Sequence, residues 1–257
     1  MSGVRCQGNG GQVPRTRHPT PDTCDARHLT PDTWFPIFAE IMTASATQAL
    51  YPSRSGAGAL LGRQVYRRTT PPTIVLGVTP TGVEVAANAA KAMQARFDVI
   101  VAAHVRMDGL GTIGALAEDG EAVLDPAFEP RFGLLAALEE AVDRARRAIK
   151  SERLLFRGPR PLRSVEGMNV IVVDGQLTSP WKVLAAVQAV REQEPANVLV
   201  AAPISTHPVQ ELLHARRIDF VCPSVLVDPA GHPHPFGDPR DPSAERLRSI
   251  VVAREAA

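Results

Sequence analysis

The sequence has few cysteines and no long hydrophobic segment. Its three cysteines, Cys6, Cys24 and Cys222, form an odd set without a Cys-x-x-Cys pair, so neither a disulfide framework nor a zinc site is indicated. A reducing, cytoplasmic setting is therefore expected. No apolar run approaches the roughly 18 residues that would span a membrane, and residues 1–21 lack the apolar core of a secretory signal. We expect no membrane partner.

An excess of charge of one sign is also absent, because the formal net charge of the 257 residues is +1. This balance gives no reason to expect broad electrostatic binding to nucleic acid. The length suits one sizeable α/β domain with an extension. We place the extension at residues 1–50 and the domain at residues 51–257.

Residues 1–50 are rich in Gly, Pro, Thr and Arg and show no sustained periodicity before Trp34. One interpretation is a poorly ordered tail, or sequence upstream of a true start at Met42. The other is an arm that covers a partner subunit or the active site. In that case the apolar residues from Trp34 to Ile41 would form a short amphipathic helix that docks.

From residue 70 onward, short apolar runs alternate with helical patterns. Strands are predicted at 73–78, 97–105, 169–173, 197–202 and 220–222, a hairpin at 112–117 and 122–124, and helices at 82–95, 134–153, 181–192 and 209–216. This alternation predicts a parallel sheet of about five strands with helices on both faces. Ligands of such sheets bind at the carboxyl ends of the strands, so the loops after Val78, Val105 and Val173 are the candidate ligand loops.

The loop after Val173 has the pattern of a phosphate cradle. Asp174 ends the strand, Thr178 and Ser179 offer hydroxyl donors, and a helix follows whose first N–H groups can face an anion. Taken alone this pattern is weak, because many α/β proteins place a capping Asp after a strand.

The wider sequence resembles a bacterial family of type I phosphoribosyltransferase-domain proteins. The resemblance is carried by Tyr51-Pro-Ser-Arg54, Val75-Leu-Gly-Val-Thr-Pro-Thr-Gly82, Ile113-Gly-Ala-Leu-Ala-Glu118, Phe156-Arg-Gly158, Val170-Ile-Val-Val-Asp174 and Phe236-Gly-Asp238. It implies the type I phosphoribosyltransferase fold, the donor 5-phosphoribosyl 1-pyrophosphate (PRPP) with Mg²⁺ as cofactor, and a dimer.

The ligand loops depart from the family pattern. The family's Val-Asp-Asp-Gly-Leu-Ala-Thr-Gly-Ala-Thr is matched by Val173 to Lys182, with Gly175 in place of the second acid and Gln176 in place of the glycine. Pro180 removes a backbone donor, and Trp181 replaces a small residue. Each lost hydrogen bond to phosphate costs roughly 1.5–3 kcal/mol, so two losses would weaken PRPP binding by about two to four orders of magnitude.

The other two loops also lack charged groups of the family pattern. Thr79, Thr81 and Gly82 stand where the family has Pro-Arg-Gly-Gly around pyrophosphate, and Met107 replaces a lysine after Arg106. Asp174 and Arg106 are the catalytic candidates. The phosphate-binding candidates are Thr178, Ser179, Lys182 and Gln176, since lysine is a good point-charge partner for phosphate.

Two further sets of side chains have alternative interpretations. Trp181 and His207 would shape the pocket, although His207 equally fits a capped turn with Ser205 and Thr206. The acids Asp108, Glu118 and Asp119 include a candidate Mg²⁺ ligand, with solvated loop positions as the alternative.

Two functions remain in view. The first is a repurposed or non-catalytic homologue that binds a phosphorylated ligand or a partner, as a homodimer or as a hetero-oligomer with a related subunit. The alternative is an active, divergent phosphoribosyltransferase that moves ribose 5-phosphate from PRPP to another acceptor. In that case Mg²⁺ would be its cofactor.

Overall fold

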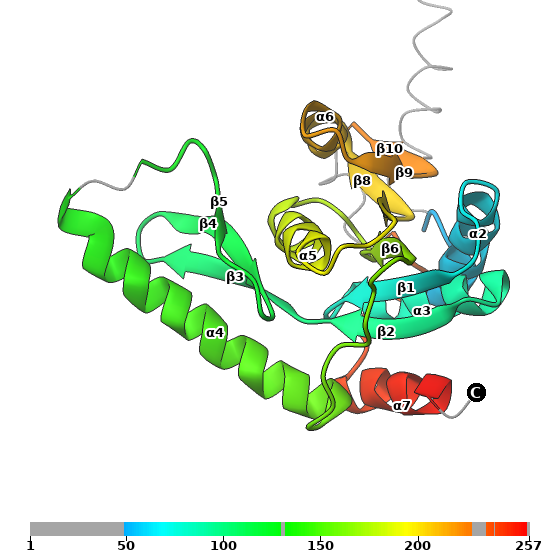
Figure 1. Cartoon of the computed structure of the whole chain (residues 1–257). Coiled ribbons are helices and arrows are strands. Elements are labelled where there is room, and N and C mark those ends of the chain that lie inside the picture. Colours follow the sequence, from blue (N-terminus) through cyan, green and yellow to red (C-terminus); the bar gives the residue numbers. More distant parts are fainter. Residues whose placement is uncertain (1–48, 130–131, 228–234, 239, 256–257) are drawn as a thin grey trace, which may run out of the picture. The chain divides into compact units, whose positions relative to one another are not determined.

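The computed structural model describes residues 49–129, 132–227, 235–238 and 240–255 (Figure 1). Nearly all of the predicted N-terminal extension, including the segment from Trp34 to Ile41, lies outside these residues. In the described part, no helix combines the length and the apolar character that crossing a membrane requires.

The main sheet has five parallel strands in the order β2-β1-β6-β7-β9. The strands are β1 (Thr73–Val78), β2 (Arg96–Ile100), β6 (Asn169–Val173), β7 (Asn197–Ala201) and β9 (Asp219–Val221). Their residues are almost entirely buried, as expected for a parallel sheet covered on both faces. The predicted fold class is confirmed, and so are the predicted strands at 73–78, 169–173, 197–202 and 220–222.

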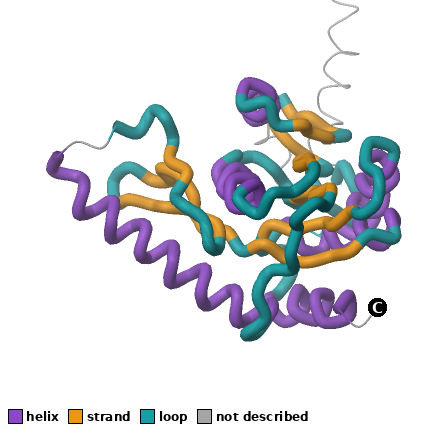
Figure 2. Tube along the Cα trace, in the orientation of Figure 1, coloured by secondary structure: helices purple, strands orange, loops and turns teal. Residues whose placement is uncertain are grey.

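Helices cover both faces of the main sheet (Figure 2). One face packs against α5 (Trp181–Arg191) and α6 (His207–Ala215). The other packs against α2 (Arg54–Tyr66), α3 (Gly82–Met93) and α7 (Ala244–Glu255). These layers leave the carboxyl ends of the strands at one edge, where the predicted ligand loops after Val78 and Val173 lie. The prediction of a ligand loop directly after Val105 is wrong, because Val105 lies within β3 (Ala102–Met107), which belongs to another sheet.

A second, antiparallel sheet is inserted between β2 and β6. It contains β3 (Ala102–Met107), β4 (Gly111–Ala117) and β5 (Val123–Leu124), in that order. The long helix α4 (Leu135–Arg157), preceded by the 3₁₀ turn η2 (Phe132–Leu134), packs along it. The apolar side of α4, with Ala141, Ala145 and Ile149, is thereby buried against the antiparallel sheet.

The prediction of one strand over residues 97–105 is wrong. The chain leaves the parallel sheet after Ile100 and enters the antiparallel sheet at Ala102. Between them, the Val101 amide donates to Glu118 Oε1 and the Val101 carbonyl accepts from the Glu118 amide. Ile100 and Val101 belong to different cores, and a continuous apolar run gives no sign of such a switch.

A third, small cluster joins the two ends of the described chain. The strands β8 (Ile204–Thr206) and β10 (Ser224–Leu226) pair in parallel. Beside them Tyr51 pairs with Phe236, and both rings are buried together with Ile204 and Leu226.

Candidate functional site

The loops after β1 and β6 are pressed together at the carboxyl edge of the main sheet. A Cβ on Gly82 would lie 2.2 Å from the Val173 carbonyl oxygen, and one on Gly175 would lie 2.3 Å from the Thr81 carbonyl oxygen. Real Cβ atoms do not approach backbone this closely. Glycine at both positions is therefore what lets the two loops meet.

Side-chain hydrogen bonds join the same two loops. The Thr81 hydroxyl donates to Asp174 Oδ1 over 2.5 Å, and the backbone amide of Gln176 donates to the same oxygen over 3.4 Å. Asp174 is only 4% exposed. Its carboxylate is thus held by this protein's own donors.

Lys182, on the first turn of α5, reaches across to the loop after β1. Its Nζ donates to the Thr79 carbonyl oxygen over 2.7 Å. This places a cation at a loop that has none of its own. The Thr79 hydroxyl is engaged as well, because it donates to Glu152 Oε2 of α4 over 2.8 Å. Glu152 was not among the predicted site residues, since a lone acid on a long helix carries no distinguishing signal.

The middle of the loop after β6 is pinned to β8. The Leu177 amide donates to Ile204, and the Ser205 hydroxyl donates to the Leu177 carbonyl. Leu177 is fully buried, whereas Thr178 is exposed. Ser205 is thus a partner of this loop, and the predicted capping by Thr206 is not seen, since its side chain makes no cap hydrogen bond.

The helix α5 starts without a side-chain cap. Pro180 is its N-cap residue and, with no N–H, gives the site no donor. Trp181 is half-buried and packs against the core under α5. The Ser179 side chain is half-buried beside it. The first amides of α5 remain the backbone donors that an anion would meet here.

His104 is a second residue that the sequence did not single out. It lies on β3, on the same side of the strand as Ala102, which packs into the core beneath α5. Burial, followed by the nearby positive charges of Lys182 and Arg106, lowers the pKa of His104. Its Nδ1 is buried without a hydrogen-bond partner in the described part of the chain. Lys182 and Arg106 thus both lie near enough to His104 to lower its pKa.

Two predicted candidates lie elsewhere. His207 begins α6 and lines a different hollow, together with His214 and Asp219. Glu118 is not a solvated loop acid or a metal ligand, because it forms a fully buried ion pair with Arg157.

The carboxylates at this edge suit a resident metal poorly. Within the described ranges, no three His, Cys, Asp or Glu side chains gather closely enough to bind one. Asp174 is the acid of the loop after β6, and one of its oxygens already accepts from Thr81. A Mg²⁺ ion here would depend on phosphate oxygens of its ligand, as is common for this ion.

Comparisons with known proteins agree with this architecture. No family model matches the chain. Over 180 residues, 67% of this chain and 40% of the relative, it is 29% identical to a Mycobacterium tuberculosis protein named "Putative phosphoribosyl transferase Rv0571c". The chain thus spans two fifths of that relative's length.

The crystal structure of TT1426 from Thermus thermophilus is 28% identical and has a TM-score of 0.67. The match covers 79% of this chain and 98% of that one. A hypoxanthine phosphoribosyltransferase from Staphylococcus aureus is a looser match, with 9% identity, a TM-score of 0.44, and coverage of 73% and 82%.

The molecule is therefore an α/β protein with a type I phosphoribosyltransferase-like fold. More particularly, it is a distant homologue of the mycobacterial phosphoribosyl transferase-like protein.

Proposed function

We propose that the chain is a repurposed phosphoribosyltransferase homologue. It binds a small phosphorylated ligand at the edge formed by residues 79–82 and 174–182 and does not turn over PRPP efficiently. The observation that carries this proposal is the direct contact between the two loops. Thr81 donates to Asp174, and its carbonyl lies where a side chain at Gly175 would start.

This contact opposes PRPP chemistry in two ways. Oδ1 of the loop's single carboxylate already accepts from Thr81 and from the Gln176 backbone amide, which leaves fewer acceptor sites for ribose hydroxyls. The second carboxylate of the family pattern does not fit at residue 175 while the loops stay together. Departing pyrophosphate also needs cations that develop favourable contacts with it, and the loop after β1 supplies none.

The phosphate end of the site keeps several donors, although Pro180 removes one. Lys182 brings a positive charge, the exposed Thr178 brings a hydroxyl, and the first amides of α5 have no acceptor within the helix. These groups together favour a phosphomonoester over a pyrophosphate. A ligand such as ribose 5-phosphate matches them without needing the missing carboxylate.

Calorimetry with ribose 5-phosphate and with Mg²⁺-PRPP tests this proposal. We expect ribose 5-phosphate to bind, PRPP to bind no more tightly, and no pyrophosphate to be released with a panel of bases as acceptors. Lys182→Met should weaken ribose 5-phosphate binding by about tenfold, the loss of one charge-assisted hydrogen bond. Lys150→Met, at an exposed lysine on α4, is the matched control. No binding of either ligand at millimolar concentration would refute the proposal.

The alternative is an active, divergent phosphoribosyltransferase. The positive charges of Lys182 and Arg106 favour it, because they come from elements other than the loop after β1, whereas His104, with its lowered pKa, adds no charge. In that case Mg²⁺ is the cofactor, with Asp174 as its protein ligand. Micromolar PRPP binding that is lost in Asp174→Asn, together with pyrophosphate release, would establish this alternative.

A partner subunit is part of the proposal. We propose that the chain assembles with itself or with a related, intact subunit, which would supply the catalytic groups missing here. Sedimentation velocity of the chain alone is the first measurement. A strictly monomeric chain at high micromolar concentration would exclude the homodimer.

A further inference from the structure

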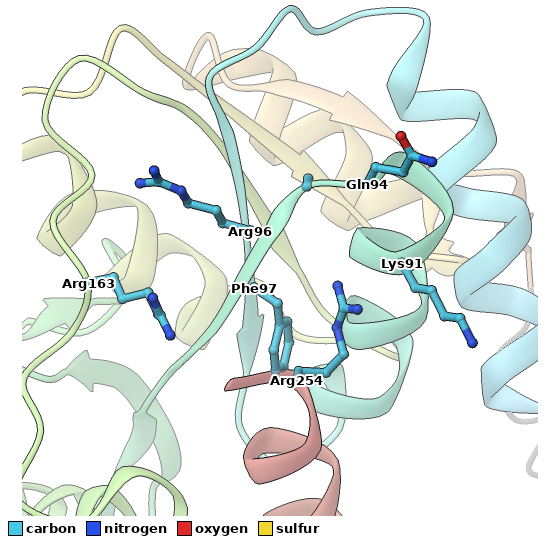
Figure 3. A pocket seen from close by; sticks show the side chains of 7 residues that line it. Lys91, Gln94, Arg96, Phe97, Arg163 and Arg254 are labelled. Carbon is cyan, nitrogen blue, oxygen red and sulfur yellow. The ribbon is translucent and has the colours of Figure 1, made fainter. Parts of the chain in front are cut away.

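A basic hollow lies at the edge of the main sheet opposite to the candidate site. It has a volume of about 400 Å³ and is lined by Lys91, Gln94, Ala95, Arg96, Phe97, Arg163 and Arg254 (Figure 3). Arg96 is the first residue of β2, so the length of the strand, about 13 Å, separates it from the carboxyl edge. The volume lies within the range of small-molecule pockets.

The lining carries four cationic side chains and, among the described residues, no carboxylate. In Figure 3, Arg163 and Arg254 flank Phe97, while Lys91 and Arg96 extend further out. Lys91 and Arg254 belong to the last turns of α3 and α7, where helix carbonyls balance part of their charge. Asp98 touches the Arg163 guanidinium only at 4.0 Å. The hollow thus keeps an excess of positive charge.

An unsatisfied donor points to an anion more specifically. The Nε of Arg254 is buried and has no hydrogen-bond partner within the described chain. A buried donor without a partner costs free energy, and an anionic oxygen would remove that cost once the Arg254 side chain turned its Nε toward the hollow. Arginine is also the side chain best suited to binding phosphate by paired hydrogen bonds.

A second, smaller hollow adjoins the basic one. It has a volume of about 200 Å³ and shares Gln94, Ala95 and Arg96 with its neighbour. Tyr66 lines it together with Pro71 and Pro72, and the Tyr66 side chain is 60% exposed. An exposed aromatic ring beside a cationic hollow suits a ligand with a flat base and a charged tail.

We propose that this edge binds a nucleoside polyphosphate, with its phosphates among Lys91, Arg96, Arg163 and Arg254 and its base against Tyr66. The site is separate from the loops of the candidate functional site. It does not depend on the function proposed for those loops.

Calorimetry on the full chain with inorganic triphosphate and with ATP tests this site. ATP should bind at least tenfold more tightly than triphosphate, because only ATP gains base stacking. The double variant Lys91→Glu, Arg96→Glu should weaken both ligands at least tenfold. Both residues are exposed, so folding should survive. Tyr66→Ala should reduce the ATP affinity to that of triphosphate and leave triphosphate unchanged.

Two controls locate the binding. Arg147→Glu with Lys150→Glu makes the same change of charge at exposed positions of α4 and should keep both affinities. Asp174→Asn should keep them as well. The proposal is overturned if neither ligand binds at millimolar concentration, if the α4 variant loses binding equally, or if Asp174→Asn abolishes it. Equal affinities for ATP and triphosphate, unaffected by Tyr66→Ala, would overturn the assignment of a nucleoside.

Discussion

Gly175 and Thr81 belong to different loops, yet the Thr81 carbonyl occupies the space that a side chain at residue 175 would need. The sequence identified the missing carboxylate at Gly175. It could not identify the reason, because the approach of the two loops depends on how β1 and β6 pair. The glycine is therefore matched to the conformation of the neighbouring loop, and restoring the acid alone would not restore the site.

Replacing Gly175 by Asp should therefore destabilise the protein and should not improve PRPP binding. A Cβ would meet backbone at 2.3 Å, and forcing atoms into packed surroundings costs roughly 1–3 kcal/mol. Urea unfolding measures this loss. Gly133→Asp is the matched control, because a Cβ there meets nothing within 4 Å. Unchanged stability together with tighter PRPP binding would show that the loops separate easily.

His104 should make stability depend on pH. Its pKa is lowered by burial and by Lys182 and Arg106, so the folded state disfavours its protonation. The resulting contribution of His104 to the free energy of unfolding is fully present above the pKa of about 6.5 that a histidine has in the unfolded chain. It is lost as the pH falls toward the lower folded value.

Urea unfolding between about pH 7.5 and pH 5 measures the effect of His104. His104→Gln should flatten the fall in unfolding free energy below about pH 6.5. His214→Gln, at an exposed position of α6, should leave the fall unchanged. If His104→Gln keeps the slope of the original protein, other groups cause it.

The remaining site residues show what pattern reasoning can reach. Lys182 was predicted to face phosphate from its place after the strand, and its Nζ does lie at the neighbouring loop. Glu152 was not predicted, because its partner Thr79 lies on a distant segment. Motifs reveal side chains that follow strands. Side chains that reach the site from an inserted helix have no such signature.

At the scale of elements, strands and helices with a clear apolar pattern were predictable. Very short strands, and a helix without such a pattern, were not. The five strands of the main sheet and the helices α3, α4 and α5 follow from periodicity. The short strands β8 and β10, with three residues each, were not predicted. β9 is as short and was predicted because it closes the alternating series of strands and helices. The helix α7 was missed, since its sequence AERLRSIVVARE lacks a clear apolar stripe.

The packing of α2 on α3 depends on two glycines one helical turn apart. A Cβ on Gly58 would lie 2.3 Å from the Val85 carbonyl oxygen, and one on Gly62 would lie 2.6 Å from the Ala89 carbonyl oxygen. The helices therefore approach with backbone against backbone. Alanine is the better helix former by about 1 kcal/mol, but at these positions it would push the helices apart.

Gly62→Ala should lower the free energy of unfolding by about 1–2 kcal/mol, because overpacking outweighs the gain in helix propensity. Thermal and urea unfolding measure this change. Gly56→Ala on the same helix is the control. Its nearest neighbour is the Ser53 hydroxyl, a side-chain atom at 3.3 Å rather than backbone, so it should cost less than Gly62→Ala. Stabilisation by both substitutions would disprove the close packing.

At the scale of the whole described chain, residues from its two ends form one structure. Tyr51 exchanges backbone hydrogen bonds with Pro235 and Gly237, and Arg54 lies over the Phe236 ring at 4.8 Å. The first and last segments of the family resemblance thus lie next to each other. Their pairing buries the two aromatic rings in one cluster.

Tyr51 should therefore control the stability of this joint, by which we mean the pairing of Tyr51 with residues 235–237. Its hydroxyl donates to the Pro203 carbonyl and lies 2.9 Å from the Ser224 hydroxyl, and its ring is buried beside Phe236. Tyr51→Phe, which removes the hydroxyl alone, should cost about 1 kcal/mol. Tyr51→Ala, which also empties the ring's place, should cost roughly 3–5 kcal/mol. Urea unfolding ranks the two variants.

Hydrogen exchange shows whether Tyr51 stabilises only the cluster around it or the whole core of the protein. In Tyr51→Phe, amides of residues 224–226 and 236–238 should exchange faster, because they belong to the cluster that Tyr51 ties together. Amides of β1 and β6 should keep their protection, since they belong to separate cores. Uniformly faster exchange across the main sheet would mean that the joint and the sheet unfold as one unit.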